Sequence, residues 1–193
     1  MSPILGIWAS AQSGSLLANS YESIATVTVG AGGSSSITFS SIPSTYKHLQ
    51  IRILTRMTRA VSYASQCPIT FNSDTTNYYR GHYLNGDGST ASAGAFTGGT
   101  PLGCWSVWAV GNSATANAFS ANIVDILDYQ NSNKYKTVRT LYGTDINGVN
   151  GDVGLYSSLF MSTAAITDLT ITCSNSSNFM QYSSFALYGI KGA

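Results

Sequence analysis

The sequence predicts an all-β protein, an antiparallel β-sandwich of the jelly-roll type with about ten strands and an extended N-terminal arm. Apolar and polar residues alternate most clearly at residues 49–57, the pattern of a strand with one buried face. Short runs of this kind recur along the chain, separated by Gly, Asn and Ser. No segment has the apolar period of a stable helix, and Glu occurs only once, at Glu22. An all-antiparallel barrel is the second choice.

The expected strands are the short apolar or alternating runs, taken in chain order. They cover residues 24–29, 37–39, 49–57, 69–71, 78–84, 104–110, 119–129, 135–142, 153–161, 166–173 and 179–190. The segments between them, such as 30–33, 85–88, 131–133 and 147–148, contain residues that tolerate the positive φ of tight turns.

Two segments depart from the alternating pattern. Residues 1–20 begin apolar and continue rich in Ser and Gly, which predicts an attachment arm outside a sandwich domain of residues 21–193. A large apolar side chain left in water costs about 1.5–3 kcal/mol relative to burial, so the arm should dock on its own domain or on a neighbouring subunit. Residues 86–103 are Gly, Ser, Thr and Ala rich and predict a long exposed contact loop. The arm candidates are Ile4, Leu5, Ile7, Trp8, Leu16 and Leu17; the loop candidates are Asn85, Asp87, Phe96 and Leu102.

Composition excludes several classes of function. The chain has 193 residues, a size that favours one domain, and only 9% of them are charged. A formal net charge of +1 gives no field that would attract a polyanion, so no nucleic-acid partner is expected. No stretch approaches the roughly 18 apolar residues of a membrane span, so no membrane insertion is expected.

Titratable residues that could carry catalysis are few and scattered. His48 and His82 each lack a second His or Cys at a metal-ligand spacing. Asp125 and Asp128 lie on opposite faces of one strand, so they do not converge as a glycosidase pair would. The sequence therefore predicts no enzyme, with no catalytic, cofactor-binding or metal-binding residues.

For three further groups of residues, a structural role is favoured over a functional one. Asp125 is expected to pair with Arg139 or Lys136 across a hairpin. Residues 145–152 fail the EF-hand pattern, which leaves a loose oxygen-rich cation site as the less favoured alternative to a turn. The cysteines are odd in number and widely spaced, so they are expected to be small buried apolar residues: Cys67, Cys104 and Cys173.

Aromatic and basic residues give the remaining candidates. Trp105 and Trp108 lie on opposite faces of one predicted strand, so one of them could be exposed beside polar groups and stack on a sugar. Core or subunit packing is favoured for most aromatic residues, including Tyr78, Tyr79 and Tyr83. A basic stripe could face an acidic partner or keep its strand soluble, and it comprises Lys47, Arg52, Arg56 and Arg59.

Several strings resemble small accessory virion proteins of tailed bacteriophages over nearly the whole chain. They are MSPILGIWAS at 1–10, YESIATV at 21–27, IPSTYKHLQIR at 42–52, DILDY at 125–129 and QYSSFALYGIKG at 181–192. The resemblance implies a non-enzymatic structural protein on the outer surface of a virion. Such proteins include capsid decoration (cement) trimers and tail modules, and the strings do not separate the two. The short apolar arm and the lack of a coiled-coil or repeat shaft favour a trimeric capsid decoration protein, expected to stabilise the shell and to be able to contact the host surface.

The alternative that the resemblance leaves open is a receptor-binding module of a tail fibre or tailspike. A third hypothesis, a hydrolase of envelope polysaccharide, lacks its converging carboxylate pair. The implied partners are further copies of the chain in a homotrimer, the major capsid protein or other virion proteins, and a host-surface glycan.

Overall fold

The computed structural model describes residues 20–76, 79–97, 103–147 and 150–192. Within these ranges the chain forms twelve β-strands and no helix, so the described part has no helix of the length and apolarity that crosses a membrane. The predicted arm residues Ile4, Leu5, Ile7, Trp8, Leu16 and Leu17, and the loop residue Leu102, lie outside the described residues. The strands are β1 (Tyr21–Thr28), β2 (Ser36–Phe39), β3 (His48–Thr55), β4 (Ala64–Phe71), β5 (Tyr79–Gly86), β6 (Ala91–Thr97), β7 (Cys104–Val110), β8 (Ser120–Leu127), β9 (Lys136–Thr144), β10 (Asp152–Phe160), β11 (Leu169–Thr172) and β12 (Ser184–Ile190).

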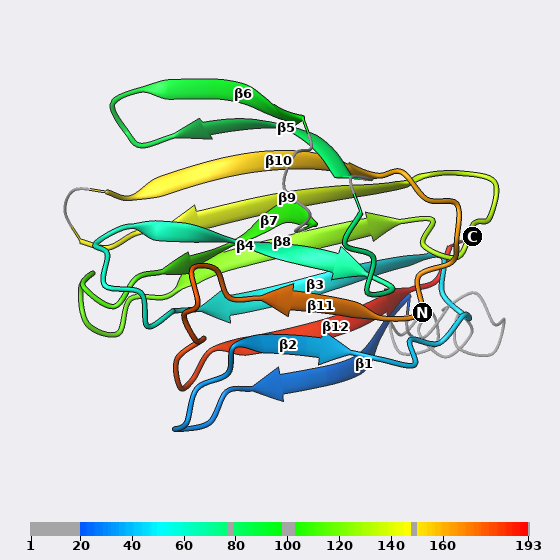
Figure 1. Ribbon diagram of the computed structural model, residues 1–193, viewed down its shortest axis with the longest axis horizontal. Helices are drawn as coiled ribbons and strands as arrows, with labels where there is room; N and C mark the ends of the chain where they lie inside the picture. Colours follow the sequence, from blue (N-terminus) through cyan, green and yellow to red (C-terminus); the bar gives the residue numbers. More distant parts are fainter. Residues whose placement is uncertain (1–19, 77–78, 98–102, 148–149, 193) are drawn as a thin grey trace, which may run out of the picture.

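The strands form two antiparallel sheets, which lie one over the other in Figure 1. The larger sheet has eight strands in the order β1-β12-β3-β8-β9-β10-β5-β6, and the smaller has four in the order β2-β11-β4-β7. The predicted all-β, antiparallel fold is confirmed, and the two layers are consistent with a β-sandwich. Eleven strands overlap the runs chosen from the sequence, and β6 is additional.

The core lies between the sheets, because each strand turns alternate side chains inward. In β3 the inward residues are Leu49, Ile51 and Ile53, and in β11 they are Leu169 and Ile171. These side chains are almost completely removed from water. The alternate positions of the large sheet point away from the core and form the outer face of the molecule.

Residues 86–97 of the segment predicted as a long contact loop belong instead to a hairpin. Residues Tyr79–Gly86 pair with Ala91–Thr97 along seven positions, so only residues 87–90 form the turn. Asp87 closes this turn by accepting hydrogen bonds from the backbone N–H groups of Ser89 (2.9 Å) and Thr90 (2.7 Å). Phe96 lies in β6 and not in a loop. The prediction failed because β6 is built mainly from Ala, Ser, Gly and Thr, which give no apolar alternation.

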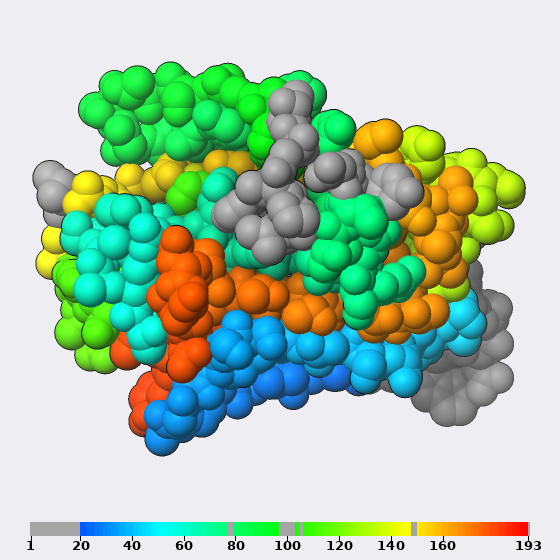
Figure 2. All heavy atoms as spheres, viewed as in Figure 1, coloured from blue at the N-terminus to red at the C-terminus, as the bar shows by residue number. Residues whose placement is uncertain are grey.

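The β5–β6 hairpin extends the large sheet beyond the small one. Edge strand β7 faces mainly β8, β9 and β10 and has fewer contacts with β5, so the β5–β6 hairpin continues the large sheet past it. In Figure 1 and Figure 2 the hairpin stands at the upper edge of the molecule, apart from the four-stranded sheet. The inner face of the large sheet is therefore partly uncovered beyond β7, and the candidate site lies there.

Candidate functional site

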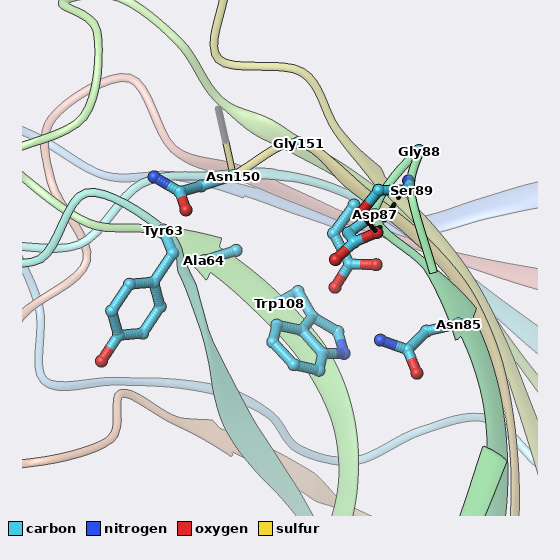
Figure 3. A pocket seen from close by; sticks show the side chains of 10 residues that line it. Tyr63, Ala64, Asn85, Asp87, Gly88, Ser89, Trp108, Asn150 and Gly151 are labelled. Carbon is cyan, nitrogen blue, oxygen red and sulfur yellow. Dashed lines mark hydrogen bonds between the residues drawn. The ribbon is translucent and has the colours of Figure 1, made fainter. Parts of the chain in front are cut away.

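A hollow of about 720 Å³ lies where the large sheet extends past β7. Its wall is contributed by the start of β4, the β5–β6 turn, β7 and the segment that enters β10. Figure 3 shows the side chains of the lining residues around the open space. They are Tyr63, Ala64, Asn85, Asp87, Gly88, Ser89, Trp108, Asn150, Gly151 and Asp152. A second hollow of about 520 Å³ adjoins it and shares Asp87 and Asp152.

Trp108, which lines this hollow, belongs to a row of packed aromatic rings. The Trp108 ring stacks on Tyr142 of β9, with ring centroids 4.7 Å apart and planes 16° from parallel. Tyr156 of β10 meets Trp108 edge-on at 5.9 Å and stacks on Tyr83 of β5 at 5.3 Å. Such contacts fix ring orientation as well as burying area. Burial raises the pKa of Tyr156 to about 12, so its phenol stays protonated at neutral pH.

A glycine on β10 makes room for this row. Gly154 lies directly opposite Tyr142, and a Cβ atom added at Gly154 would be 2.4 Å from the Tyr142 ring. No real Cβ contact is that short, so the Tyr142 ring occupies the space that a side chain at position 154 would fill. The position of Trp108 against Tyr142 therefore depends on this glycine.

Two carboxylates and an amide also line the hollow. Asp87 accepts hydrogen bonds from Thr90 and Ser89, first of all from their backbone N–H groups, and these lower the pKa of its carboxyl. Asp152 accepts a hydrogen bond on Oδ2 from Tyr142 Oη at 2.7 Å. Asn85 accepts one on Oδ1 from Ser92 Oγ at 2.6 Å, and Figure 3 shows its amide nitrogen on the side of the Trp108 indole nitrogen.

Two buried polar atoms of these residues have no hydrogen-bond partner among the described residues. They are the indole Nε1 of Trp108, a donor, and Oδ1 of Asp152, an acceptor. Buried polar atoms without a partner are rare in folded proteins and call for a specific explanation. Both atoms belong to residues that line the hollow.

The predicted basic stripe does not exist, because Arg56 is buried. Its exposed fraction is 5%, and its guanidinium donates to four backbone carbonyls of the β7–β8 loop. Strand β3 ends at Thr55, so the alternation does not continue to Arg56. The four acceptors, at 2.7–3.1 Å, are Asn112, Ala114, Thr115 and Ala118.

The other three residues of that stripe have separate local contacts. Arg52 is exposed on the outer face, donates to Gln50, and lies over the ring of Tyr188 at 5.5 Å. Arg59 donates to Ser65 Oγ at 2.7 Å. Lys47 Nζ lies 3.4 Å from Asp128 Oδ1. Each side chain therefore has an intramolecular contact of its own.

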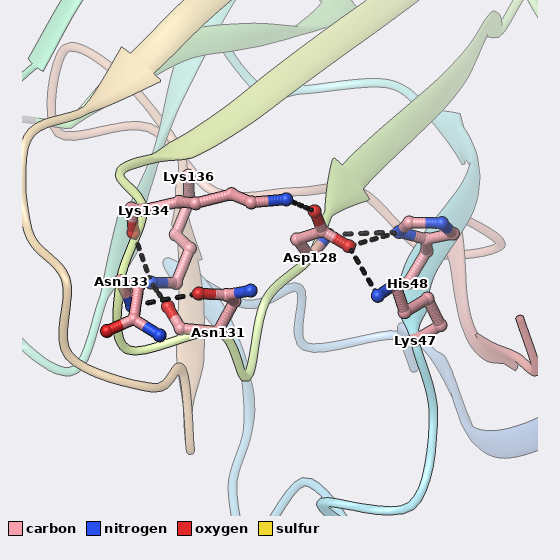
Figure 4. Close-up of polar contacts among 7 residues, drawn as sticks. All are labelled: Lys47, His48, Asp128, Asn131, Asn133, Lys134 and Lys136. Atoms are coloured by element: carbon pink, nitrogen blue, oxygen red, sulfur yellow. Dashed lines mark hydrogen bonds and ion pairs between the residues drawn. The ribbon is translucent and has the colours of Figure 1, made fainter.

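Asp128, which directly follows the C-terminal end of β8, is the centre of a polar cluster (Figure 4). Lys134 donates to Asp128 Oδ2 at 2.6 Å, and this hydrogen bond is the main reason that the pKa of the carboxyl is lowered. His48 Nδ1 accepts the backbone N–H of Asp128 at 2.9 Å, which gives this half-buried histidine a structural contact. Lys136 is fully buried and donates to three backbone carbonyls, of Asn131, Lys134 and Thr163.

The predicted pairing of Asp125 is only partly right. Asp125 lies directly opposite Arg139 in the β8–β9 ladder, but the hydrogen bond that it accepts comes from Gln50 of β3, at 2.8 Å. Lys136 cannot be its partner, because that side chain turns to the inner face. His82 is exposed on β5.

The outer face of the large sheet carries a row of exposed apolar side chains across neighbouring strands. Ile123, Leu141, Leu155 and Leu84 lie directly opposite one another on β8, β9, β10 and β5. Their exposed fractions are 39%, 53%, 50% and 56%. The next row of the same face adds Leu54 on β3 and Val153 on β10, which are exposed to a similar degree.

The cysteine prediction is confirmed, because Cys67, Cys104 and Cys173 are free and buried. No group of three His, Cys, Asp or Glu side chains that could hold a metal ion occurs among the described residues. Asp145 caps its own turn by accepting the N–H of Asn147 at 3.1 Å.

Comparisons with protein-family models, with curated proteins and with solved structures found no match. A function for this chain therefore has to be inferred from its own residues and their geometry.

The sequence predicts part of the hollow. Asn85 and Asp87 are among the contact-loop candidates, and Trp108 is one of the two tryptophans considered for stacking on a sugar. The sequence marks Asp152 only as the last residue of a weak candidate cation loop, and no pattern in the sequence points to Tyr63. Trp108 is half-buried; of Trp105 only the backbone is described, and Tyr78 lies outside the described residues. Tyr79 packs in the core, as favoured.

Proposed function

We propose that this chain is a non-enzymatic structural protein on the outer surface of a tailed-bacteriophage virion. Its most favoured role is that of a homotrimeric capsid decoration protein, which stabilises the shell through contacts with its own copies and with the major capsid protein. The observation that carries this proposal is the apolar row on the outer face of the large sheet. The resemblance of the sequence to accessory virion proteins is the reason for proposing that the assembly is a tailed-bacteriophage virion.

The apolar row favours an assembly surface, because soluble monomeric proteins seldom expose a large contiguous apolar patch. Contiguous exposed apolar patches larger than a few hundred Å² are typical of interfaces. Here four large side chains, each about half exposed, stand side by side on adjacent strands. Burying one such residue fully contributes about 1.5–3 kcal/mol, so covering the row would stabilise an assembly substantially.

The size of the outer face fits a second copy of the chain. Eight strands about 4.8 Å apart, each about eight residues long at about 3.3 Å per residue, give a face of about 900 Å². A standard stable interface buries about 800 Å² of each partner. The polar row beside the apolar one has mixed charge, with Asp125 next to Arg139 and Arg52 nearby, so the face presents both charge signs to neighbouring copies.

We also infer that the sandwich is a jelly roll with two inserted hairpins. Without β5–β6 and β9–β10, four strands remain in each sheet, and consecutive strands change sheet at every step except from β4 to β7. Eight strands divided between two sheets in this way are the usual jelly-roll count, an architecture common in capsid domains. The inserted hairpins widen the outer face.

Cryo-electron microscopy of intact virions tests the proposed function. We expect density for this chain over the capsid lattice, with the outer face of the large sheet covered by neighbouring copies. Purified virions that lack the chain altogether would overturn the proposal.

The second candidate function is a receptor-binding module of a tail fibre or tailspike. The hollow, with Trp108 and Tyr63 beside polar groups in its lining, favours it, because that combination of groups suits a ligand and not a protein interface. Density confined to the tail tip in the same images would decide for this alternative.

A further inference from the structure

We propose that the hollow beyond β7 is a binding site for a neutral saccharide. This inference concerns a different surface from the assembly face and is independent of where the chain sits on a virion. It depends on the two buried atoms without partners, on the aromatic lining residues Trp108 and Tyr63, and on the charge of the wall.

A sugar hydroxyl satisfies both of the atoms that lack partners. The Trp108 Nε1 group needs an acceptor, and Asp152 Oδ1 needs a donor. A hydroxyl accepts and donates at the same time, so neighbouring hydroxyls of one ring can serve both atoms. The amide nitrogen of Asn85, which Figure 3 shows on the side of the indole nitrogen, adds a second donor.

The aromatic residues supply the apolar part of the site. Trp108 is held against Tyr142, so it presents a fixed aromatic surface to the hollow. Tyr63 stands at the rim with 46% of its surface exposed. An aromatic surface beside polar groups suits the C–H face and hydroxyl edge of a pyranose ring. The volume, about 720 Å³, is within the range of small-ligand sites and exceeds that of a single sugar ring.

The charge of the wall selects against acidic sugars. Two carboxylates, Asp87 and Asp152, line the hollow, and none of the described residues that line it is basic. Asp87 is held ionised by the N–H groups of its turn. A carboxylate or sulfate on the ligand would be repelled, whereas uncharged hydroxyl groups would donate to these oxygens.

The test is a binding screen of the full chain against a panel of neutral disaccharides: lactose, maltose, cellobiose and di-N-acetylchitobiose. Sialyllactose and digalacturonic acid serve as acidic probes. Ligand-observed NMR at millimolar sugar detects binding, and titration of the strongest binder gives its affinity. We expect at least one neutral sugar to bind and the acidic probes not to bind.

Two variants then locate the binding site. Trp108→Phe keeps an aromatic ring on Tyr142 but removes the N–H donor, and Asp152→Asn removes the charge while leaving an acceptor for Tyr142. Each is expected to weaken binding about tenfold or more, because hydrogen bonds to charged or buried groups are lost. Asp168→Asn, just before β11 and outside the hollow, is the matched control and should bind as the wild type does. If either variant fails to fold, Asp87→Asn in the exposed turn replaces it.

Three results would overturn the inference. They are the absence of binding to every neutral probe, a preference for the acidic probes, and affinity that is unchanged in the folded Trp108 and Asp152 variants. A monomeric chain that still binds a neutral sugar would leave this inference standing while contradicting assembly through the outer face.

Discussion

Replacing Arg56 with Met should destabilise the domain severely. The guanidinium is 5% exposed and is the shared donor for four carbonyls of residues 112–118. Each buried acceptor that loses its partner costs about 1–3 kcal/mol, although an exposed loop recovers part of this by binding water. Removing one partner from a buried charged network typically costs about 3–5 kcal/mol, and we expect a loss of that size.

The matched control is Arg52→Met, in the strand that leads to Arg56. Arg52 is exposed, and its contact with the Tyr188 ring at 5.5 Å contributes about 0.5–1 kcal/mol. Urea denaturation followed by circular dichroism gives the free energy of unfolding of both variants. A domain of this kind is stable by only about 5–15 kcal/mol, so the difference is easily measured.

Thr115 links Arg56 to a second segment of the chain. Thr115, whose carbonyl Arg56 holds, donates through Oγ1 to the carbonyl of Ile146 at 2.5 Å, in the segment that leads to β10. If Arg56→Met does not fold, Arg56→Lys, which cannot reach all four carbonyls, should show an intermediate loss. An Arg56→Met protein within about 1 kcal/mol of the wild type would refute this reasoning.

Three further predictions concern the rest of the domain. Gly154→Ala should lower the melting temperature because its Cβ would meet the Tyr142 ring, whereas Gly143→Ala, with open space around its Cβ, should change it little; equal melting shifts would contradict this. The pKa of Asp128 is lowered in the folded state, mainly because Lys134 donates to its carboxylate. The ionised carboxylate therefore stabilises the folded domain at pH values above its unfolded-state pKa. This stabilisation is lost as the pH falls through the folded-state pKa. Asp128→Asn should therefore be less stable than the wild type near neutral pH and equal to it in acid, and a difference independent of pH would be evidence against that ion pair. Burial raises the pKa of Cys104, and all three thiols are buried, so a thiol reagent should label none in the native protein and all in urea; rapid native labelling would show that the core opens.

The fold class is accessible from the sequence because one face of most strands is buried against an apolar layer. Alternation such as that of β9, where Val138, Thr140 and Tyr142 turn inward, leaves a period-two pattern. Strand β6 leaves no such pattern, since it lies beyond the small sheet and has little apolar surface to bury. Its pairing with β5 comes from backbone hydrogen bonds, and Gly81 and Gly94 leave room for the facing rings of Phe96 and Tyr83.

The candidate site is less accessible because it depends on the partners of individual side chains. Arg56 follows the alternating strand β3 and looks solvent-facing, yet the β7–β8 loop folds over it. The exposed row of Ile123, Leu141, Leu155 and Leu84 depends on the register of three consecutive strands and on the pairing of the last of them with β5, which comes much earlier in the chain. In the sequence each of these residues is an ordinary strand residue.

The measurement that most directly tests assembly through the outer face is the molar mass of the purified chain in solution. Sedimentation equilibrium of the wild type should give a multiple of 20.3 kDa, with the trimer expected. Leu141→Asn, in the middle of the apolar row, should shift the mass toward 20.3 kDa without loss of β structure, whereas Tyr135→Asn, an exposed aromatic outside the row, should not. A wild-type chain that stays at 20.3 kDa at every concentration, or an assembly indifferent to Leu141→Asn, would contradict the account.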